Sequence, residues 1–237
     1  QSSMDYRTFG RSGLRVSDLI LGAMAFGDGH GGLPAADCRA IFTAYADAGG
    51  NVVDTANRYT SGESERIVGD LVASDRDRFV VATKYTLALD DNDPNSAGNH
   101  RLSLRRSLEQ SLRNLRTDRI ELLWVHIWDQ LTPIEETMRA LDDAVRAGQV
   151  LYVGVSNMPA WLVARANTLA DLRGWSPFIG VQMPYSLVKR DIEREILPMS
   201  DALGLSVAAW SPLGSGILSG SYSRAGREPG SADRSSI

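Results

Sequence analysis

Residues 79–84 read FVVATK, a nearly continuous apolar run that closes on a lysine. A strand of this composition is covered on both faces, as the strands of a parallel sheet are. Similar runs recur along the chain, and each is followed by a polar turn and then by a segment with helical apolar spacing. The sequence therefore predicts a series of alternating β-strands and α-helices.

Seven strands are predicted in all, at residues 19–25, 51–56, 79–84, 122–127, 152–157, 180–185 and 206–211. With helices between them, these strands fit either a doubly wound sheet or an incomplete (β/α)₈ barrel. Ahead of them, YRTFGRSGLRVSD at residues 6–18 predicts a β-hairpin, because a glycine-centred turn separates two short apolar runs. We expect this hairpin to lie outside the repeat, at a barrel floor or a sheet edge.

The helix predicted over residues 132–147 has the clearest end signals. Thr132 is its expected N-cap, Pro133 its first helical residue and Glu135 the partner in a capping box, and Gly148 follows its end. Apolar residues that share one face predict two more helices, with Ile41, Tyr45 and Ala48 in the first and Leu104, Leu108, Leu112 and Leu115 in the second. We expect both faces to pack in the core.

Composition narrows the class of protein. The 237 residues are 43% hydrophobic, which suits a single domain with a buried core, and we place that domain at residues 4–237, with residues 1–3 as a cloning remnant. The 25 Lys and Arg against 29 Asp and Glu lack the basic excess of a nucleic-acid binder. No apolar run approaches the roughly 18 residues of a membrane span. Cys38 is the only cysteine, which excludes an intrachain disulfide, and we expect a cytoplasmic protein.

Polar residues stand where the predicted strands end. Ligands of both candidate architectures bind at the carboxyl ends of the strands, so we expect these residues to meet at one rim. They are Gly22 and Met24, Asp54 with Tyr59 five residues later, Lys84, His126, Ser156 and Asn157, Gln182, and Trp210 with Ser211. The lysine and the histidine stand out, because a buried strand ordinarily ends in turn residues.

Four of these residues suit proton transfer to a substrate oxygen. A phenol is a weak acid near neutral pH unless something stabilises the phenolate, and a neighbouring ammonium does so. We therefore predict Tyr59 as the general acid beside Lys84, with Asp54 paired to Lys84, while neutral His126 hydrogen-bonds the substrate oxygen or relays the proton. Taken singly, each residue is more often structural. Their coincidence at one rim favours the catalytic interpretation.

A glycine motif near the first strand carries less weight. Gly27, Gly29 and Gly32 satisfy G-x-G-x-x-G, the fingerprint of a dinucleotide-binding turn. In that turn the third glycine already lies in the helix, whereas residues 33–34 intervene here. We expect a loop at this place.

Two later motifs also concern nucleotides. Tyr185 and Lys189 give the Y-x-x-x-K pair that short-chain dehydrogenases carry on a helix, but here the pair follows a strand. Gly214, Gly216 and Gly220 follow the last predicted strand, and backbone amides freed by glycine can cradle a pyrophosphate. A plain glycine-rich turn is the alternative interpretation.

Taken together, several motifs resemble those of a known family. DTANRY, ATK, WVH, VGVSN, the glutamine at 182 and WSPLGSGILSG stand in the order and spacing of the aldo-keto reductases. The opening segment FGRSGLRVSDLILGAMAFG, residues 9–27, is similar to that of the family's bacterial, channel-β-subunit-like branch.

The resemblance implies a (β/α)₈ barrel that binds NADPH without a Rossmann fold and transfers hydride from the nicotinamide to a small aldehyde or ketone. Matched residue by residue, the catalytic tetrad falls on Asp54, Tyr59, Lys84 and His126. The implied cofactor-binding residues are Gly22, Met24, Asp54, Ser156, Asn157, Gln182, Trp210, Ser211, Leu213, Gly214, Gly216 and Leu218. The expected substrate pocket is lined by Met24, Tyr59, Trp124, His126 and Trp128.

The resemblance also implies an eighth strand and closing helices after the glycine loop, with groups that hold the adenine 2′-phosphate. Residues 222–237 have the composition of a loop instead, so we expect a C-terminally truncated barrel with seven strands. Potassium-channel β subunits share this fold and tetrad, so a cofactor-binding regulatory subunit is the alternative function. A short-chain dehydrogenase is a weaker alternative, and an oligomer is compatible with either.

Overall fold

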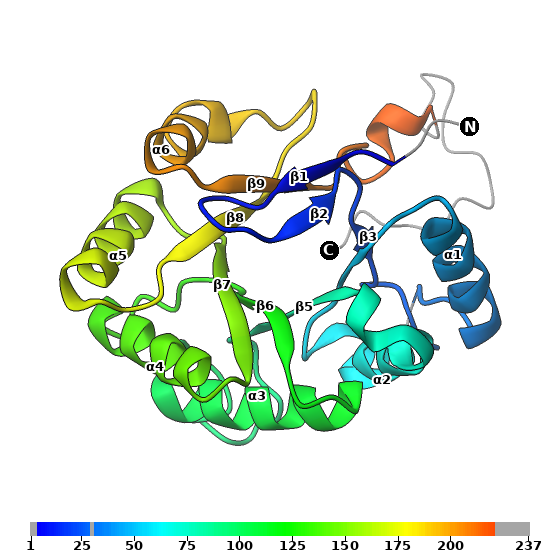
Figure 1. Cartoon of the computed structure of the whole chain (residues 1–237), viewed down its shortest axis with the longest axis horizontal. Coiled ribbons are helices and arrows are strands. Elements are labelled where there is room, and N and C mark those ends of the chain that lie inside the picture. Colours follow the sequence, from blue (N-terminus) through cyan, green and yellow to red (C-terminus); the bar gives the residue numbers. More distant parts are fainter. Residues whose placement is uncertain (1–3, 29–30, 221–237) are drawn as a thin grey trace.

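A parallel sheet of seven strands forms the centre of the computed structural model, which describes residues 4–28 and 31–220 (Figure 1). Strands that are consecutive in the chain are neighbours in the sheet. They are β3 (Leu21–Gly22), β4 (Val52–Asp54), β5 (Val80–Tyr85), β6 (Ile120–Val125), β7 (Val150–Ser156), β8 (Phe178–Pro184) and β9 (Ser206–Trp210). All seven predicted strands are confirmed, with ends that differ by a few residues.

Helices cover the outer face of the curled sheet (Figure 1). Among the described residues the α-helices are α1 (Ala35–Asp47), α2 (Glu63–Val72), α3 (Arg101–Leu115), α4 (Ile134–Arg146), α5 (Ala160–Arg173) and α6 (Ile196–Leu203). Short 3-10 turns are η1 (Tyr59–Gly62), η2 (Ala73–Arg78), η3 (Asp191–Glu193) and η4 (Ile217–Ser219). This arrangement confirms the incomplete (β/α)₈ barrel. Within the described part of the chain, β3 and β9 end the sheet and do not pair with each other.

Apolar side chains fill both sides of the sheet, because successive residues of a strand point to opposite faces. The outer cluster lies between sheet and helices and includes Phe42 of α1, Leu123 of β6 and Val163 of α5. The inner cluster lies inside the curl and consists of Phe9, Val16, Val52, Val80, Ala82, Leu122, Trp124, Ile179 and Ala208. The inner cluster fills the space beneath the carboxyl ends of the strands, so the rim stands on a packed core.

The N-terminal hairpin closes the floor of this inner space. Its strands, β1 (Tyr6–Thr8) and β2 (Arg15–Ser17), pair antiparallel. Phe9 follows β1 and packs edge-on against Trp124, with ring centroids 6.1 Å apart. A Cβ on Gly180 would lie 2.5 Å from the Phe9 ring, so only glycine admits the ring at this position of β8. The predicted hairpin is confirmed, and it lies at the barrel floor.

The predicted capping box at the start of α4 is wrong. The helix begins at Ile134 with Pro133 as its N-cap. Thr132 Oγ1 donates instead to the Asp129 carboxylate, at 2.7 Å, and Glu135 accepts from Arg165. The Thr132 hydroxyl is directed to the Asp129 loop, and α4 has no side-chain cap hydrogen bond.

The predicted inner face of α1 is also wrong, whereas that of α3 is confirmed in outline. The buried residues of α1 are Cys38, Phe42 and Ala46, and Ile41 is 41% exposed. This helix carries two overlapping apolar stripes at similar spacing. Phe42 decides between them, because its ring packs against Phe79 with centroids 5.0 Å apart.

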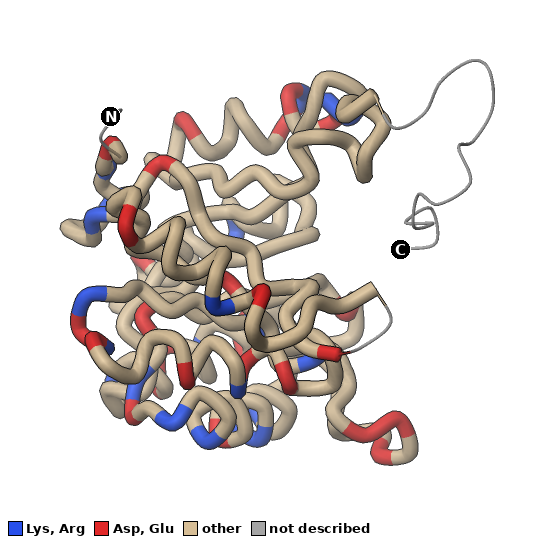
Figure 2. Tube along the Cα trace, turned by 90° about the vertical axis from the view of Figure 1, so that its right-hand side faces the viewer, with Lys and Arg blue, Asp and Glu red and all other residues tan. Residues whose placement is uncertain are grey.

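Charged residues of both signs are interspersed along the outer helices (Figure 2). None of the helices in the described part of the chain is long and apolar enough to cross a membrane. Two sequence predictions, the cloning remnant at residues 1–3 and the loop-like segment at 222–237, lie outside the described residues.

Candidate functional site

The register of the sheet brings the predicted site residues to one rim. Because all seven strands run in the same direction, their carboxyl ends share one edge, and adjacent strands set residues side by side. The paired positions are Gly22 with Asp54, Lys84 with Trp124, Ser156 with Gln182, and Pro184 with Trp210.

A buried ion pair forms the base of the site. Lys84 is 1% exposed, and its Nζ lies 2.5 Å from Asp54 Oδ2 and also donates to the carbonyl of Thr55 at 2.7 Å. Asp54 Oδ1 accepts from Trp124 Nε1 at 3.0 Å and from Gln182 Nε2 at 3.2 Å. Both carboxylate oxygens are therefore engaged, which holds the ammonium in one position.

Tyr59 lies directly over this ammonium. Lys84 Nζ is 4.8 Å from the centroid of its ring, and the His126 ring stands edge-on to it at 6.0 Å. Residues 60–62, which follow the tyrosine, all have positive φ angles of 46°, 55° and 87°. Left-handed backbone is costly outside glycine, so the surrounding structure must hold this turn in place. The predicted tetrad residues Asp54, Lys84, Tyr59 and His126 thus lie together at the rim.

Thr60 and Ser64 hold the turn after Tyr59, and sequence reasoning missed both. Thr60 Oγ1 donates to the carbonyl of Phe26 at 2.7 Å and accepts from the Ser64 amide at 2.9 Å. Ser64 Oγ hydrogen-bonds Thr55 Oγ1 at 2.7 Å, in the loop that follows β4. The available signal was a pair of hydroxyl residues four positions apart, which is too common to single out.

His126 is held as a neutral imidazole. Burial, and then the nearby Lys84, lower its pKa from 6.5 to about 4. Its backbone amide donates to the Tyr85 carbonyl at 3.1 Å, and its own carbonyl accepts from Asn157 Nδ2 at 3.0 Å. A neutral imidazole carries one donor and one acceptor nitrogen, so it can hydrogen-bond a substrate oxygen without a net charge.

Hydroxyl and amide side chains stand beside the tetrad, at the ends of β7 and β8. Ser156 Oγ donates to the carbonyl of Gln182 at 2.7 Å, and Asn157 Nδ2 donates to Ser156 Oγ at 3.0 Å as well as to the His126 carbonyl. Asn157 has a φ of 49°, in the left-handed region that asparagine tolerates better than most residues. These contacts order three of the polar residues that the family resemblance implies for cofactor binding.

Trp210 presents its indole at the end of β9, where it is 43% exposed. The loop beyond it turns repeatedly through positive φ, with 52° at Ser211, 57° at Gly214 and 94° at Gly216. Leu213 in this loop is 56% exposed, and its carbonyl accepts from the Leu218 amide at 3.0 Å. The predicted cofactor residues of this loop therefore lie beside an accessible aromatic ring.

On the other edge of the sheet, β3 leaves room above the rim. A Cβ built on Gly22 meets no heavy atom within 4 Å, and Met24 is 50% exposed. The open space at Gly22 lies beside Asp54. A ligand can therefore approach the backbone of β3 closely.

An aromatic wall stands beside His126. Trp128 is half-buried against the outer core, and it packs edge-on against Trp161 of α5 with ring centroids 5.9 Å apart. Ile127 and Trp161 are 42% and 58% exposed. Trp124, predicted in the pocket wall, is 1% exposed instead, because its register beside Lys84 points the ring into the floor toward Phe9.

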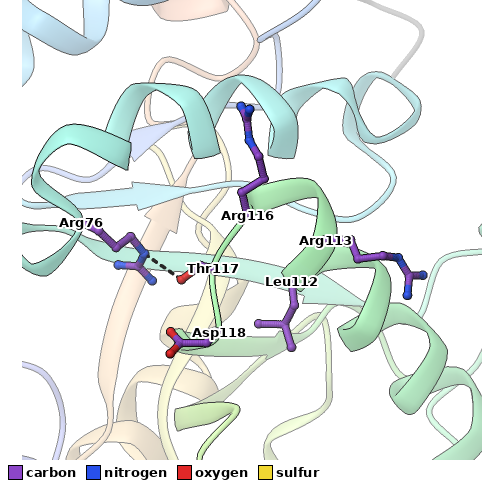
Figure 3. A pocket seen from close by; sticks show the side chains of 6 residues that line it. All are labelled: Arg76, Leu112, Arg113, Arg116, Thr117 and Asp118. Carbon is purple, nitrogen blue, oxygen red and sulfur yellow. Dashed lines mark hydrogen bonds between the residues drawn. The ribbon is translucent and has the colours of Figure 1, made fainter.

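The hollow drawn in Figure 3 lies elsewhere and is no part of this site. It is an open depression of about 530 Å³ where α3 ends, on the face opposite the rim. Its lining residues are Arg76, Leu112, Arg113, Arg116, Thr117 and Asp118. Its guanidinium groups are engaged by the protein itself, since Arg76 donates to Thr117 and Glu121 and Arg116 pairs with Asp70.

The two rival nucleotide motifs lie in loops, as expected. Helix α1 begins at Ala35, after the N-cap Pro34, so Gly32 precedes the helix. Gly29 lies outside the described residues. Tyr185 follows β8 and donates to Glu193 at 2.8 Å, and it is not on a helix with Lys189.

Comparison with known proteins supports the same family. The aldo/keto reductase family profile matches residues 18–236. The chain is 43% identical over 235 residues to norsolorinic acid reductase of Aspergillus flavus, covering 94% of this chain and 61% of the relative. It is 44% identical over 216 residues to a norsolorinic acid reductase of Emericella nidulans, covering 86% and 56%. A putative aryl-alcohol dehydrogenase of Saccharomyces cerevisiae is 41% identical over 217 residues, covering 86% and 58%.

The chain spans about three fifths of the length of the curated relatives that it matches. These relatives are fungal, so they do not support the predicted bacterial, channel-β-subunit-like branch. The family assignment does not depend on the branch, because the profile match begins directly after β2 and extends across every strand of the seven-stranded sheet. The chain belongs to the aldo/keto reductase family, whose members reduce carbonyl groups with a nicotinamide cofactor.

Proposed function

We propose that the protein reduces a carbonyl group to an alcohol with NADPH, and that Tyr59 is the general acid. The observation that carries this proposal is the position of the buried Lys84 ammonium 4.8 Å from the centre of the Tyr59 ring. As the phenol gives up its proton, negative charge develops on its oxygen, and the ammonium stabilises that charge. Asp54 keeps the ammonium in place through their ion pair.

The rim fits a nicotinamide ring. Gln182 and Asn157 supply amides at the ends of neighbouring strands, and these match the donor and acceptor of a carboxamide. Trp210 offers an exposed planar ring on the adjacent strand, against which another planar ring can stack. Nicotinamide, when bound, supplies the hydride for the reaction.

The protein's own residues then act on the substrate oxygen. Neutral His126 donates a hydrogen bond to the carbonyl oxygen, which orients and polarises it. Tyr59 delivers a proton to the same oxygen as the alkoxide develops. The ring centroids of Tyr59 and His126 are 6.0 Å apart, so both side chains can reach the same substrate oxygen. Phosphate groups of the cofactor would contact the turns at Ser211 and Gly214.

An aromatic carbonyl is the substrate class that the site favours. The edge-on pair of Trp128 and Trp161 forms an aromatic, apolar surface beside His126, and Ile127 extends it. Such surfaces gain free energy by covering aromatic ligands. Names of the relatives agree with this choice, since they include norsolorinic acid reductases and an aryl-alcohol dehydrogenase.

Nucleotide titration followed by tryptophan fluorescence tests the cofactor site without a substrate. We expect saturable quenching by NADPH, and loss of most of that quenching in Trp210→Ala, with Trp175→Ala as the matched control far from the rim. NADH in parallel shows which nucleotide is preferred. No quenching by either nucleotide would contradict the proposed cofactor site.

Steady-state reduction of an aromatic aldehyde tests the chemistry. Tyr59→Phe keeps the ring over Lys84 but removes the proton, so we expect kcat to fall by about 10²–10⁴-fold with the affinity for NADPH unchanged. Nucleotide binding by the wild type without any turnover would instead assign a regulatory, cofactor-binding role.

A further inference from the structure

Two loops flank His126 and are tied together by one reciprocal pair of hydrogen bonds. The loop after β5 ends at Asn99, and the loop after β6 contains Asp129. The Asn99 amide donates to Asp129 Oδ2 at 2.7 Å, and the Asp129 amide donates to Asn99 Oδ1 at 3.0 Å. Each residue thus binds the backbone of the other through its side chain. We call this pair the loop clamp.

Asn99 also fixes the backbone that follows His126. Its Nδ2 donates to the carbonyl of Ile127 at 2.8 Å and to Thr86 Oγ1 at 3.0 Å, and the residue is 1% exposed. All the side-chain groups of Asn99 are therefore engaged, and each contact belongs to one of the two loops. A buried amide with this many partners holds a single orientation.

Asp129 organises its own loop at the same time. Its Oδ1 accepts from the amides of Leu131 and Thr132, both at 2.9 Å, and its Oδ2 accepts from Thr132 Oγ1 at 2.7 Å in addition to Asn99. Burial opposes ionisation, but these hydrogen bonds outweigh it and hold the pKa of Asp129 below its usual range. The carboxylate is thus ionised and committed to backbone donors.

The backbone of Thr86 adopts a conformation that is unfavourable for a threonine. Thr86 has a φ of 114°, which is unusual for a β-branched residue. Its carbonyl accepts from the Gly98 amide at 2.7 Å, next to Asn99, and the clamp fixes its hydroxyl. Strained backbone persists only where the surroundings determine it, and such positions cluster at functional sites.

The segment that carries His126 is consequently anchored from both sides. Asn157 binds the carbonyl of His126 on the side of the proposed cofactor site, and Asn99 binds the next carbonyl, at Ile127, on the other side. We propose that Asn99 and Asp129 are positioning residues, which fix the His126 imidazole and the Ile127–Trp128 wall against the substrate. This inference rests on the proposed carbonyl reduction.

Asp129→Asn tests the loop clamp, because it disrupts the contact with the Asn99 amide and keeps the Oδ1 contacts within the turn at residues 129–132. The substitution keeps an Oδ1 acceptor for the Leu131 and Thr132 amides but puts an NH₂ opposite the Asn99 amide, where two donors then face each other. The Thr132 hydroxyl, which donated to the replaced oxygen, can rotate to accept from the NH₂. Asp90→Asn is the matched control, because Asp90 accepts from the Asn92 amide within its own turn in the same loop.

We expect Asp129→Asn to lower kcat/KM for an aromatic aldehyde by about tenfold or more, with NADPH affinity by fluorescence unchanged. Misplaced substrate groups change the catalytic step, whereas a general loss of folding would lower both quantities together. Asp90→Asn should match the wild type in both. Equal loss of kcat/KM and nucleotide affinity, or no loss of either, would overturn the proposal.

Hydrogen exchange gives a reading that does not depend on activity. Amides of residues 127–129 and of Asn99 should exchange faster in Asp129→Asn than in the wild type, while peptides from β7 should not change. If the wild type reduces no carbonyl, the proposed function fails, and unchanged exchange would then separately refute the clamp. Should Asp129→Asn not fold, Asn99→Ala serves in the same two measurements.

Discussion

Lys84 Nζ lies 2.5 Å from Asp54 Oδ2 at the carboxyl ends of adjacent strands, and the pair is almost wholly shielded from solvent. A buried charge is costly unless its partner and hydrogen bonds compensate for lost hydration. Here Thr55, Trp124 and Gln182 supply those bonds. A stable fold could accommodate apolar residues at these positions, so the pair points to a chemical requirement for the ammonium.

Breaking this pair should unfold the protein more readily. Lys84→Met leaves the Asp54 carboxylate buried and unpaired, so we expect the free energy of unfolding to fall by about 3–5 kcal/mol. In Lys84→Met combined with Asp54→Asn the uncompensated charge is absent, and part of the loss should be recovered. Urea denaturation of the wild type, the two single variants and the double variant measures this. A double variant as unstable as the sum of the two single variants would argue against coupling.

Trp124 should matter for catalysis through Asp54, although it lies in the floor. Trp124→Phe keeps an aromatic ring against Phe9 but removes the Nε1 donor to Asp54 Oδ1, so we expect a loss of about 1–3 kcal/mol in stability. Carbonyl reduction should slow as well, because Asp54 positions Lys84. Trp175→Phe, outside the rim, is the control. Wild-type kinetics in Trp124→Phe would show that the indole has only a packing role.

Acid should destabilise the fold through His126. Its pKa is about 4 in the folded chain against 6.5 ordinarily, so its contribution to stability is complete above pH 6.5. As the pH falls from 6.5 toward 4, the unfolded chain binds a proton that the folded chain does not, which lowers the unfolding free energy by up to about 1.4 kcal/mol per pH unit. Urea denaturation across this range should show a shallower dependence in His126→Gln. Identical slopes would contradict the neutral, buried imidazole.

The floor should not tolerate a methyl group at Gly154. A Cβ at this position of β7 would lie 2.5 Å from the Trp124 ring, whereas one at Gly13 in the hairpin turn meets nothing within 4 Å. We expect Gly154→Ala to lose about 1–3 kcal/mol through overpacking, and Gly13→Ala to change stability little. Thermal denaturation compares them. Equal melting temperatures would mean that Trp124 moves aside at no cost.

Strand repetition and the rim residues were predictable from the sequence because each depends on local pattern. Apolar runs closed by Lys84 and His126 identify buried strands, and parallel topology alone then brings their ends together. The spacing of apolar residues does not show which of the two apolar faces of α1 is buried. That depends on a tertiary contact, the packing of Phe42 against Phe79.

The sequence does not predict which loops contact each other. Asn99 and Asp129 are thirty residues apart in unremarkable polar turns, and nothing local indicates that they bind each other. The same applies to the capping of α4, where Asp129 takes the Thr132 hydroxyl. Trp124 and His126 are two residues apart, so strand alternation puts both side chains on the inner face of the sheet. That pattern does not show that the Trp124 ring lies below the rim, against Phe9.

The most direct test of the account follows the hydrogen that is transferred. NADPH carrying deuterium at the reactive position of nicotinamide C4 is incubated with the protein and an aromatic aldehyde, and the product is analysed by mass spectrometry. The account predicts alcohol that carries the deuterium on its carbinol carbon with the wild type, and only traces with Tyr59→Phe, although both bind NADPH. Unlabelled alcohol from the wild type, or labelled alcohol formed equally fast by Tyr59→Phe, would contradict hydride transfer with Tyr59 as the acid.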